Sequence, residues 1–477
     1  MALRIWNSLT RRKEEFVPLV GGEVRMYVCG VTVYDLSHIG HARSALVFDV
    51  IRRYLGFRGY RVRFVKNFTD VDDRIIRRAS GEGVTAREVS ERFIEEYRAD
   101  MTALGVLPND VEPKATDHIP EMLALIETLI TKGVAYVLEG DVYFEVRRFP
   151  DYGRLSGKNV EDLRAGARVE VDERKRDPLD FALWKASKPG EPAWPSPWGP
   201  GRPGWHIECS AMAMKYLGPT FDLHGGGEDL IFPHHENEIA QSEAATGQPF
   251  VRYWSHNGFV NLGAEKMSKS LGNTLLIREL LKRHEPEAIR LYLLGTHYRH
   301  PVEFAEERIA ETARALGRLR GIVAEAERLA SRGTPAPGPD RGLLEEVAIA
   351  RTRFEAAMDD DFNTPQALGA LFDLARSLQS ARARVSEGTL GASAFLMGTG
   401  ELVSLARTLG LLHGPVPAPA AQPDAELKGK IDSLLLRREE ARKRRDFREA
   451  DRLRDELAAL GVVIEDTREG TTWKLRR

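Results

Sequence analysis

The chain has 477 residues, of which 42% are hydrophobic and 29% charged, a balance that excludes fibrous and disordered classes and predicts roughly three globular domains. Its formal charge of −2 excludes a global basic excess, so a nucleic-acid partner would have to bind local patches. The N-terminus lacks the apolar core of a signal peptide, no stretch is long enough to span a membrane, and two distant cysteines give no disulfide framework, so we expect a cytoplasmic protein.

The first predicted elements alternate between strand and helix. Residues 24–29 are an apolar run typical of a buried strand, residues 42–55 carry apolar side chains at every fourth position, as a helix does, and residues 62–65 resemble a second strand. Strand, helix and strand in succession predict a parallel α/β sheet with a nucleotide-type site at the strand ends.

Two helices and a long irregular segment follow. Thr85 and Glu88 form a capping box at the start of one predicted helix, and His118–Lys132 form another. Residues 148–204 are rich in Pro, Gly and Trp without clear periodicity, and their aromatic residues favour an ordered functional segment over a disordered one. We therefore expect an insertion at about 110–200.

The α/β pattern resumes after this insertion. Thr220–His224 and residues 251–256 are strand-like, and residues 232–246 lie between them as a predicted helix. These elements complete an α/β domain that we place at residues 1–300.

The rest of the chain is predicted to be helical. It divides at a Pro/Ala-rich linker, Gly414–Ala421, which marks a domain boundary. Before the linker we expect a helical bundle over residues 301–413, and after it a small C-terminal domain over residues 425–477, built from a helix pair and a strand-like end. The predicted fold is thus a Rossmann-like parallel-sheet α/β domain with an insertion, a helical bundle and a small C-terminal domain.

Cys29 and Cys209 are the only cysteines in the chain, and both lie near histidines. Cys29 ends the first predicted strand, and Cys209 precedes the His-rich run Phe232–Glu238. Two distant cysteines combined with a helical His/Glu pair predict a zinc site, because Zn²⁺ accepts sulfur, nitrogen and oxygen ligands together. The alternative is a pair of buried free cysteines, since Cys is among the most buried residue types, but the nearby histidines favour the metal site.

Eight of the 12 histidines lie between residues 38 and 256, which supports a functional centre in this part of the chain, although each one taken alone can be structural. They are His38, His41, His118, His206, His224, His234, His235 and His256.

Two short motifs indicate phosphate binding. His38-Ile39-Gly40-His41 opens the first predicted helix, whose free N–H groups attract phosphate, while Gly40 lets a ring or phosphate approach closely. In Lys266-Met267-Ser268-Lys269-Ser270, two lysines flank small residues and can neutralise charge that develops on a phosphoryl group. The alternatives are a structural turn and a solvated basic loop, but the order of the two motifs, more than 200 residues apart, favours a functional pair.

This pair of motifs resembles the class I aminoacyl-tRNA synthetases. Within that class, the similarity to the cysteinyl-tRNA synthetase family extends over nearly the whole chain. The supporting segments are Val28–Asp35, Phe68–Asp73, Gly204–Cys209 and Ala357–Pro365. Val31 departs from the family pattern, which has proline there, and this change alters a turn beside Cys29 rather than a catalytic group.

The resemblance implies one zinc ion per chain, which the thiolate of a substrate cysteine joins, held by Cys29, Cys209, His234 and Glu238. His234 and Glu238 are four residues apart and so point from one helical face, whereas His235 and Glu236 are expected to point elsewhere, in supporting or structural roles. An apolar pocket separates near-isosteres such as cysteine and serine only about a hundredfold, whereas a soft Lewis acid binds a thiol far more readily than an alcohol. Zinc would therefore select the substrate, and no editing domain would be needed.

The amino-acid pocket is also outlined by the resemblance. Thr69 and Trp205 are expected to line it, with a packed core indole as the alternative role for Trp205. Gly225–Asp229 follows a predicted strand, where α/β folds bind ligands, or else forms only a turn. Asp229 is a candidate for holding the substrate ammonium.

The implied reaction has two steps. Cysteine attacks the α-phosphate of ATP to give cysteinyl-adenylate, and the acyl group then passes to a 3′ ribose hydroxyl of the cysteine tRNA. His38, Gly40 and His41 would bind ATP, and Lys266 and Lys269 would stabilise charge in the transition state. Mg²⁺ accompanies ATP by analogy with the family.

The basic tail supplies the prediction of RNA binding. Lys428–Arg454 contains 11 basic and six acidic residues, a local excess of +5 that suits phosphate neutralisation, with a solvated helix face as the alternative. The end of the chain resembles the family's anticodon-reading end, where Trp473 can stack on an unpaired base. The candidate tRNA-binding residues are Arg442, Lys443, Arg444, Arg445 and Trp473, and the bundle would contact the tRNA stem.

Two other functions compete with this interpretation. A related ligase that joins cysteine to an amino sugar would share the zinc and ATP motifs but would not need the basic tail beyond Gly414. A non-catalytic RNA-binding paralogue would not need the intact histidines and lysines of the two motifs. We expect a monomer that binds tRNA, L-cysteine and ATP.

Overall fold

The structure is a computed structural model. It describes residues 2–158, 174–262, 265–266, 275–331, 341–387, 389–390, 392–413, 425–444, 446–460, 462–467 and 470–475. None of the helices in these ranges is long and apolar enough to cross a membrane.

A four-stranded parallel sheet forms the centre of the α/β domain, in the order β10-β9-β3-β4. Its strands are β3 (Glu23–Thr32), β4 (Arg61–Thr69), β9 (Phe221–Gly227) and β10 (Val251–Asn257). The predicted α/β class with a parallel sheet is confirmed. Such sheets bind ligands at the carboxyl ends of their strands, and Cys29 lies towards that end of β3.

Helix α1 (Ile39–Phe57) connects β3 to β4 and packs its apolar side against the sheet. The fit is close: a Cβ atom at Gly225 of β9 would lie 2.2 Å from the ring of Phe48 in α1. Residues Gly225–Gly227 belong to strand β9, so they do not form the turn that the sequence analysis gave as an alternative. Glycine is required there because helix and sheet approach each other too closely for a side chain.

The segment after β4 carries helices α2 (Asp73–Glu82) and α3 (Ala86–Ala103), the short turn η1 (Ala115–His118) and α4 (Ile119–Thr131). The predicted capping box is present, with the Thr85 hydroxyl accepting from the Glu88 N–H and the Glu88 carboxylate accepting from the Thr85 N–H. Helix α4 was predicted to begin at His118; it begins one residue later, after the 3₁₀ turn.

An antiparallel sheet lies within the insertion, in the order β5-β6-β7-β8. Its strands are β5 (Ala135–Leu138), β6 (Asp141–Phe144), β7 (Phe181–Ala186) and β8 (Gly201–Pro203). Two of them fall within the stretch that the sequence predicted to be irregular. The Gly-Arg-Pro sequence of β8 has no strand propensity, and β8 is a strand only because it pairs with β7.

The sheet of the insertion leads into α6 (Trp205–Leu217), and β9 leads through the turns η3 (Glu228–Leu230) and η4 (Ile231–His235) into α7 (Glu236–Thr246). The helix predicted over 232–246 is therefore wrong in its first turn. Phe232 has an extended backbone (φ −139°, ψ 132°), as expected for a residue that precedes proline. The regular α-helix begins only at Glu236.

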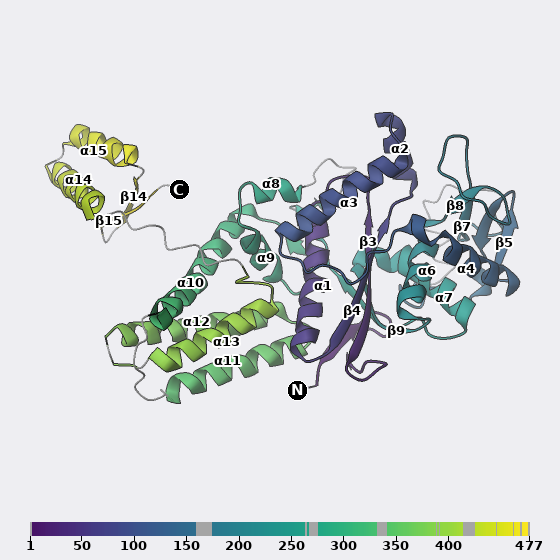
Figure 1. The fold of residues 1–477 in the computed structure, drawn as a ribbon, viewed down its shortest axis with the longest axis horizontal. Helices are drawn as coiled ribbons and strands as arrows, with labels where there is room; N and C mark the ends of the chain where they lie inside the picture. The colour runs from purple at the N-terminus through teal and green to yellow at the C-terminus, as the bar shows by residue number, and fades with distance from the viewer. Residues whose placement is uncertain are drawn as a thin grey trace.

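The remaining elements include two short sheets, a group of long helices and a terminal helix hairpin (Figure 1). The short strands are β1 (Arg4–Asn7), β2 (Arg12–Glu15), β11 (Val260–Leu262), β12 (Glu265–Lys266) and β13 (Val302–Glu303). The helices are α8 (Ile277–Leu281), α9 (Pro286–Leu294), α10 (Glu306–Ser331), α11 (Arg341–Asp359), α12 (Thr364–Ser386) and α13 (Ala392–Thr408). The terminal unit comprises α14 (Ala425–Lys443), α15 (Phe447–Ala459), β14 (Val462–Thr467) and β15 (Gly470–Leu475).

Buried charged side chains join the α/β domain to the helical bundle through hydrogen bonds. Arg290 of α9 is fully buried and donates to the carboxylate of Asp49 in α1 and to the Leu409 carbonyl, 2.8 Å away. Asp361, between α11 and α12, accepts from the Trp6 backbone N–H at 2.8 Å and the Tyr298 hydroxyl at 2.7 Å. Because a buried charge is costly unless paired, these contacts hold the bundle in one position on the α/β domain.

Candidate active site and metal centre

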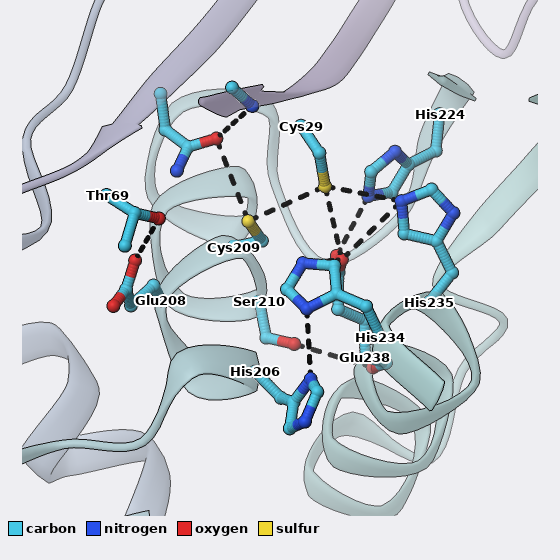
Figure 2. A network of polar contacts seen from close by, with 12 residues as sticks. Cys29, Thr69, His206, Glu208, Cys209, Ser210, His224, His234, His235 and Glu238 are labelled. Carbon is cyan, nitrogen blue, oxygen red and sulfur yellow. Dashed lines mark hydrogen bonds and ion pairs between the residues drawn. The ribbon is translucent and has the colours of Figure 1, made fainter. Parts of the chain in front are cut away.

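Four potential metal ligands meet beside the carboxyl end of β3 (Figure 2). They are Cys29 of β3, Cys209 of α6, His234 of η4 and Glu238 of α7, and their ligand atoms all lie within 4.8 Å of one another. The two sulfur atoms are 3.6 Å apart, and His234 Nε2 lies 3.0 Å from Glu238 Oε1. The sequence therefore named a set of residues, from three distant segments, that the fold brings together.

The donor set fits zinc. Two thiols, an imidazole and a carboxylate, all buried, are a combination that Zn²⁺ accepts and harder cations do not. Both cysteines are free thiols. The same four groups also suit the charge of a divalent cation, because they hold at least two negative charges in a buried site.

The electrostatics of the cluster show how closely its charges interact. Burial opposes ionisation of Cys209, but its contacts with Cys29 and His234 lower the pKa of this thiol to about 6. Burial and the adjacent Cys209 raise the pKa of Cys29 well above its usual value. Burial opposes the charged form of His234, and the Glu238 carboxylate outweighs it to raise the pKa of this imidazole to about 10. Each group therefore ionises according to the charge of its neighbours.

Four further histidines surround this cluster. His224 Nε2 lies 2.8 Å from Glu238 Oε2, and His206 Nδ1 lies 2.9 Å from His234 Nδ1. His235 Nδ1 lies 2.8 Å from His256 Nε2. Such contacts orient ligand side chains and set their tautomers. The only sequence signal for these residues is the concentration of histidines in this part of the chain.

His235 differs from its prediction. Its Nε2 atom lies 3.2 Å from Cys29 Sγ, and it belongs with Cys29, His224 and Glu238 to a second set of ligand atoms within 4.8 Å. The prediction assumed a regular helix, in which neighbouring residues point in different directions. The chain instead forms the irregular turn η4, from which both consecutive histidines reach the cluster.

A pocket of about 530 Å³ opens next to the metal ligands. It joins Cys29 at one end to the first turn of α1 at the other, and its lining includes five residues that the sequence assigned to ligand binding: His38, Gly40, His41, Trp205 and Asp229. The volume is in the range of small-molecule and cofactor sites. The predicted phosphate motif and the predicted metal site therefore share one cavity.

The two motif histidines cap α1. His38 Nδ1 accepts from the Gly40 N–H at 3.1 Å, and His41 Nδ1 accepts from the His38 N–H at 3.2 Å. Their rings are stacked, with centroids 3.8 Å apart. A Cβ at residue 40 would lie 3.0 Å from the His38 ring, so Gly40 makes room for this imidazole. The cap therefore fixes the orientation of both rings at the N-terminal end of α1.

The predicted substrate residues lie in different positions. The Trp205 ring stacks on His234, with centroids 4.3 Å apart, and so forms a wall between the pocket and a metal ligand. Asp229 lines the pocket, beyond the end of β9. The Thr69 hydroxyl donates to buried Glu208 at 2.7 Å, and Thr69 is not among the described residues that line the pocket.

Sequence reasoning missed two residues close to the metal ligands. Asn67 Oδ1 accepts from the Gly30 N–H at 2.8 Å and lies 3.7 Å from Cys209 Sγ. A Cβ at Gly30 would lie 1.5 Å from the Asn67 carbonyl, so the two strands fit only with glycine there. Lys66, which precedes Asn67, lines the pocket as well. Neither residue belongs to a sequence motif that indicates a binding site. In the sequence, both are ordinary residues of a predicted strand or its end.

Comparison with known proteins gives this cavity its context. Three family models match successive parts of the chain: the tRNA synthetases class I (C) catalytic domain over residues 15–314, the DALR domain over 353–413 and the cysteinyl-tRNA ligase anticodon binding domain over 424–473. The cysteine–tRNA ligase of Symbiobacterium thermophilum is 55% identical over 99% of this chain and 100% of its own length. That of Alkalilimnicola ehrlichii is 56% identical over 99% of each chain.

The chain belongs to the cysteine–tRNA ligase family. The resemblance drawn from the motifs is thereby confirmed, and membership makes the protein an ATP-dependent ligase with a class I catalytic domain. Among solved structures, Mycobacterium tuberculosis methionyl-tRNA synthetase in complex with methionyl-adenylate aligns with a TM-score of 0.60 at 17% identity, covering 81% of this chain and 89% of that one. At that identity the likeness shows the shared fold alone.

The remaining predicted residues are described only in part. The backbone of Lys266 lies in β12, paired with Asn261 of β11, the strand whose first residue, Val260, lines the pocket. The Lys266 side chain, Lys269 and Arg445 lie outside the described residues. Arg442, Lys443 and Arg444 are exposed at the end of α14, and the backbone of Trp473 lies in β15.

Proposed function

We propose that this member of the cysteine–tRNA ligase family joins L-cysteine to the cysteine tRNA in two steps, adenylate formation and acyl transfer, within the pocket between α1 and the metal cluster. The observation that carries the proposal is that this one cavity is lined by Cys29, from the metal set, and by His38 and His41, from the phosphate motif. Adenylate formation requires an amino acid and ATP to be held next to each other, because proximity supplies much of the rate.

The amino-acid end of this pocket selects by chemistry. We propose that zinc is held by Cys29, Cys209, His234 and Glu238, and that when bound it supplies a soft Lewis acid that prefers a thiolate to an alcohol. Trp205 limits the pocket by covering His234, and Asp229 is placed to accept a hydrogen bond from the substrate ammonium. The pocket would thus recognise both the ammonium group and the thiol of the substrate cysteine.

The phosphate end works through charge and hydrogen bonding. The positive end of α1 and the imidazoles of His38 and His41 would bind the phosphates of ATP. Lys266 and Lys269 would stabilise the charge that develops as pyrophosphate leaves. Mg²⁺ would accompany the nucleotide. We further propose that the enzyme acts as a monomer in the cytoplasm, where its tRNA is found.

The C-terminal half would recognise the tRNA. We assign the bundle over residues 301–413 to the tRNA stem and the unit over residues 425–477 to the anticodon, with Arg442, Lys443, Arg444, Arg445 and Trp473 as candidate contacts. The match of residues 424–473 to an anticodon-binding family model supports this assignment. It also argues against the amino-sugar ligase, which would need no such unit.

Cysteine-dependent exchange of pyrophosphate into ATP, followed by charging of purified cysteine tRNA, tests the proposal. We expect exchange with cysteine and not with serine, and accumulation of cysteinyl-tRNA only when tRNA is added. Exchange that proceeds without an amino acid, or charging with an amino sugar in place of tRNA, would refute it.

A further inference from the structure

Lys66 is a buried cation with no acceptor. It lies in β4, opposite Val28 of β3, and only 7% of its surface is exposed. Within the described ranges, no carboxylate, carbonyl or hydroxyl accepts a hydrogen bond from its ammonium group. Its Nζ atom lies 5.5 Å from the centroid of the Tyr97 ring in α3, and among the described residues this aromatic ring is the contact that the charge makes.

Other buried cations of the described chain are paired. Arg290 donates to Asp49, and Arg43 donates to the carbonyl oxygens of Leu293 and His297. Even Arg74, which shares the pocket with Lys66 and is partly exposed, donates through Nε to Asp72 at 2.8 Å. The contrast is informative because burying an unpaired ammonium is costly, and contact with a ring offsets only part of that cost.

The position of Lys66 indicates what would complete its contacts. It lines the 530 Å³ pocket together with His41 and Ser44 of α1. It also lines a second cavity of about 220 Å³ with Tyr97, on the side where the ammonium now rests. Lys66 thus lines two cavities, one that contains the predicted phosphate motif and one that contains Tyr97.

We propose that Lys66 binds the phosphate chain of the nucleotide, and that its contact with Tyr97 is the resting position it leaves when ATP enters. The inference rests on the proposed function. The phosphates would lie at the N-terminal end of α1, whose free N–H groups attract anions and whose first two turns contribute His41 and Ser44 to the same lining. Lys66 would approach the phosphates from β4, opposite the helix, and act as a phosphate-binding residue in addition to the two motif lysines.

Equilibrium binding of ATP and of adenosine, measured by calorimetry on the full-length protein without cysteine, tests this proposal. Because Lys66→Met removes the charge and keeps the length, it should weaken ATP binding about 10–100-fold, the range expected for a hydrogen bond to a charged group. Binding of adenosine, which lacks phosphates, should change less than about twofold. Lys66→Arg should keep most of the ATP affinity, because it keeps the charge.

Two controls separate this role from a structural one. Lys282→Met removes a lysine that follows the last residue of α8 and has a side chain 67% exposed, and this variant should bind both ligands like the unaltered protein. Tyr97→Leu removes the ring on which the ammonium rests, together with its packing against Phe68, and should not weaken ATP binding. The melting temperature of Lys66→Met without ATP should equal or exceed that of the unaltered protein, because an unpaired buried charge is lost. A lysine needed for folding would give the opposite result.

Several outcomes would overturn the inference. Unchanged ATP binding by Lys66→Met would contradict the proposal. Equal weakening of ATP and adenosine binding would also contradict it, because it would mean that Lys66 shapes the base or ribose site. Weaker binding of cysteine alone would assign Lys66 to the amino-acid carboxylate instead. If the unaltered protein itself bound no ATP, the proposed function would fail first, so the two failures are distinguishable.

Discussion

The metal cluster and the C-terminal unit both concentrate charged groups, but they treat those groups in opposite ways. In the cluster, Cys209, His234 and Glu238 are buried, and each contacts other titratable groups at short distances. In the terminal unit, Arg442, Lys443 and Arg444 are exposed at the end of α14. The small core of this unit lies between α14 and α15 and is formed by the buried residues Ile431, Leu434, Leu453 and Leu457.

This difference fits what each region is proposed to bind. A metal ion and a thiol require ligands fixed to within a fraction of an ångström, which burial and neighbouring hydrogen bonds provide. A polyanion such as tRNA is attracted over longer distances by solvated cations, whose effect salt screens. Exposed cations destabilise the folded protein little when RNA is absent, because water solvates them. A buried set of ligands lacks that solvation and is stabilised by the ion that it binds.

The largest effect is expected at the cluster. Cys209→Ser replaces a soft ligand with a hard one, so metal content should fall well below one equivalent. Cysteine activation should fall more than about 100-fold, because even residues that only support metal ligands typically cost about 10–100-fold. Metal analysis and pyrophosphate exchange measure the two quantities. A Cys209→Ser enzyme that is fully active and metal-free would refute the role of the cluster.

The next largest effect is expected at Lys269. Lys269→Ala should slow adenylate formation about 10²–10³-fold, the usual cost of losing one group that stabilises transition-state charge. Metal content and melting temperature should stay as in the unaltered protein, because the cluster does not depend on this lysine. Single-turnover kinetics measure the chemical step. Unchanged kinetics would remove Lys269 from the mechanism.

Removal of the C-terminal unit should separate activation from tRNA charging. A protein ending at residue 413 should keep cysteine-dependent exchange but bind tRNA less tightly. If four phosphate contacts are lost, the slope of log affinity against log salt should flatten by roughly 3. Titration with tRNA at several salt concentrations measures that slope, and the melting curve of the shortened protein is the folding control. Charging with undiminished efficiency would show that the unit has no role in recognition.

The smallest effect is expected from one aromatic residue. Trp473→Ala should weaken binding of the cysteine tRNA by about 1–3 kcal/mol, the usual contribution of stacking on one unpaired base. Trp473→Phe keeps an aromatic face and should recover much of the loss. The salt dependence should not change, because stacking involves no phosphate. Equal binding by all three proteins would leave Trp473 without a role.

The sequence predicted most reliably what depends on local patterns. The strand around Cys29, the capping box of Thr85 and Glu88, and the helix after His38 all have short-range signals, and the structure has each of them. Strand β8 was missed because its residues have no strand propensity and it exists only through pairing with β7. Such pairing depends on residues far apart in the chain.

The candidate site was predicted through its motifs, and its surroundings were not. His235 was misplaced because residue spacing assumes a regular helix, whereas the chain around Pro233 is irregular. Asn67 and Lys66 were missed because the sequence of a strand does not indicate which residues of other elements its side chains contact. What a side chain contacts across a sheet follows from tertiary packing, which no local pattern encodes.

We propose that the buried cluster binds a metal ion that makes the enzyme select cysteine. The most direct test is to remove the metal from the full-length protein with a chelator, restore zinc in steps, and measure pyrophosphate exchange with cysteine and with serine. We predict that exchange with cysteine rises in proportion to bound zinc, up to about one equivalent, while exchange with serine stays at background. Metal-free protein that activates cysteine at the full rate, or zinc-restored protein that activates serine as well as cysteine, would contradict the claim.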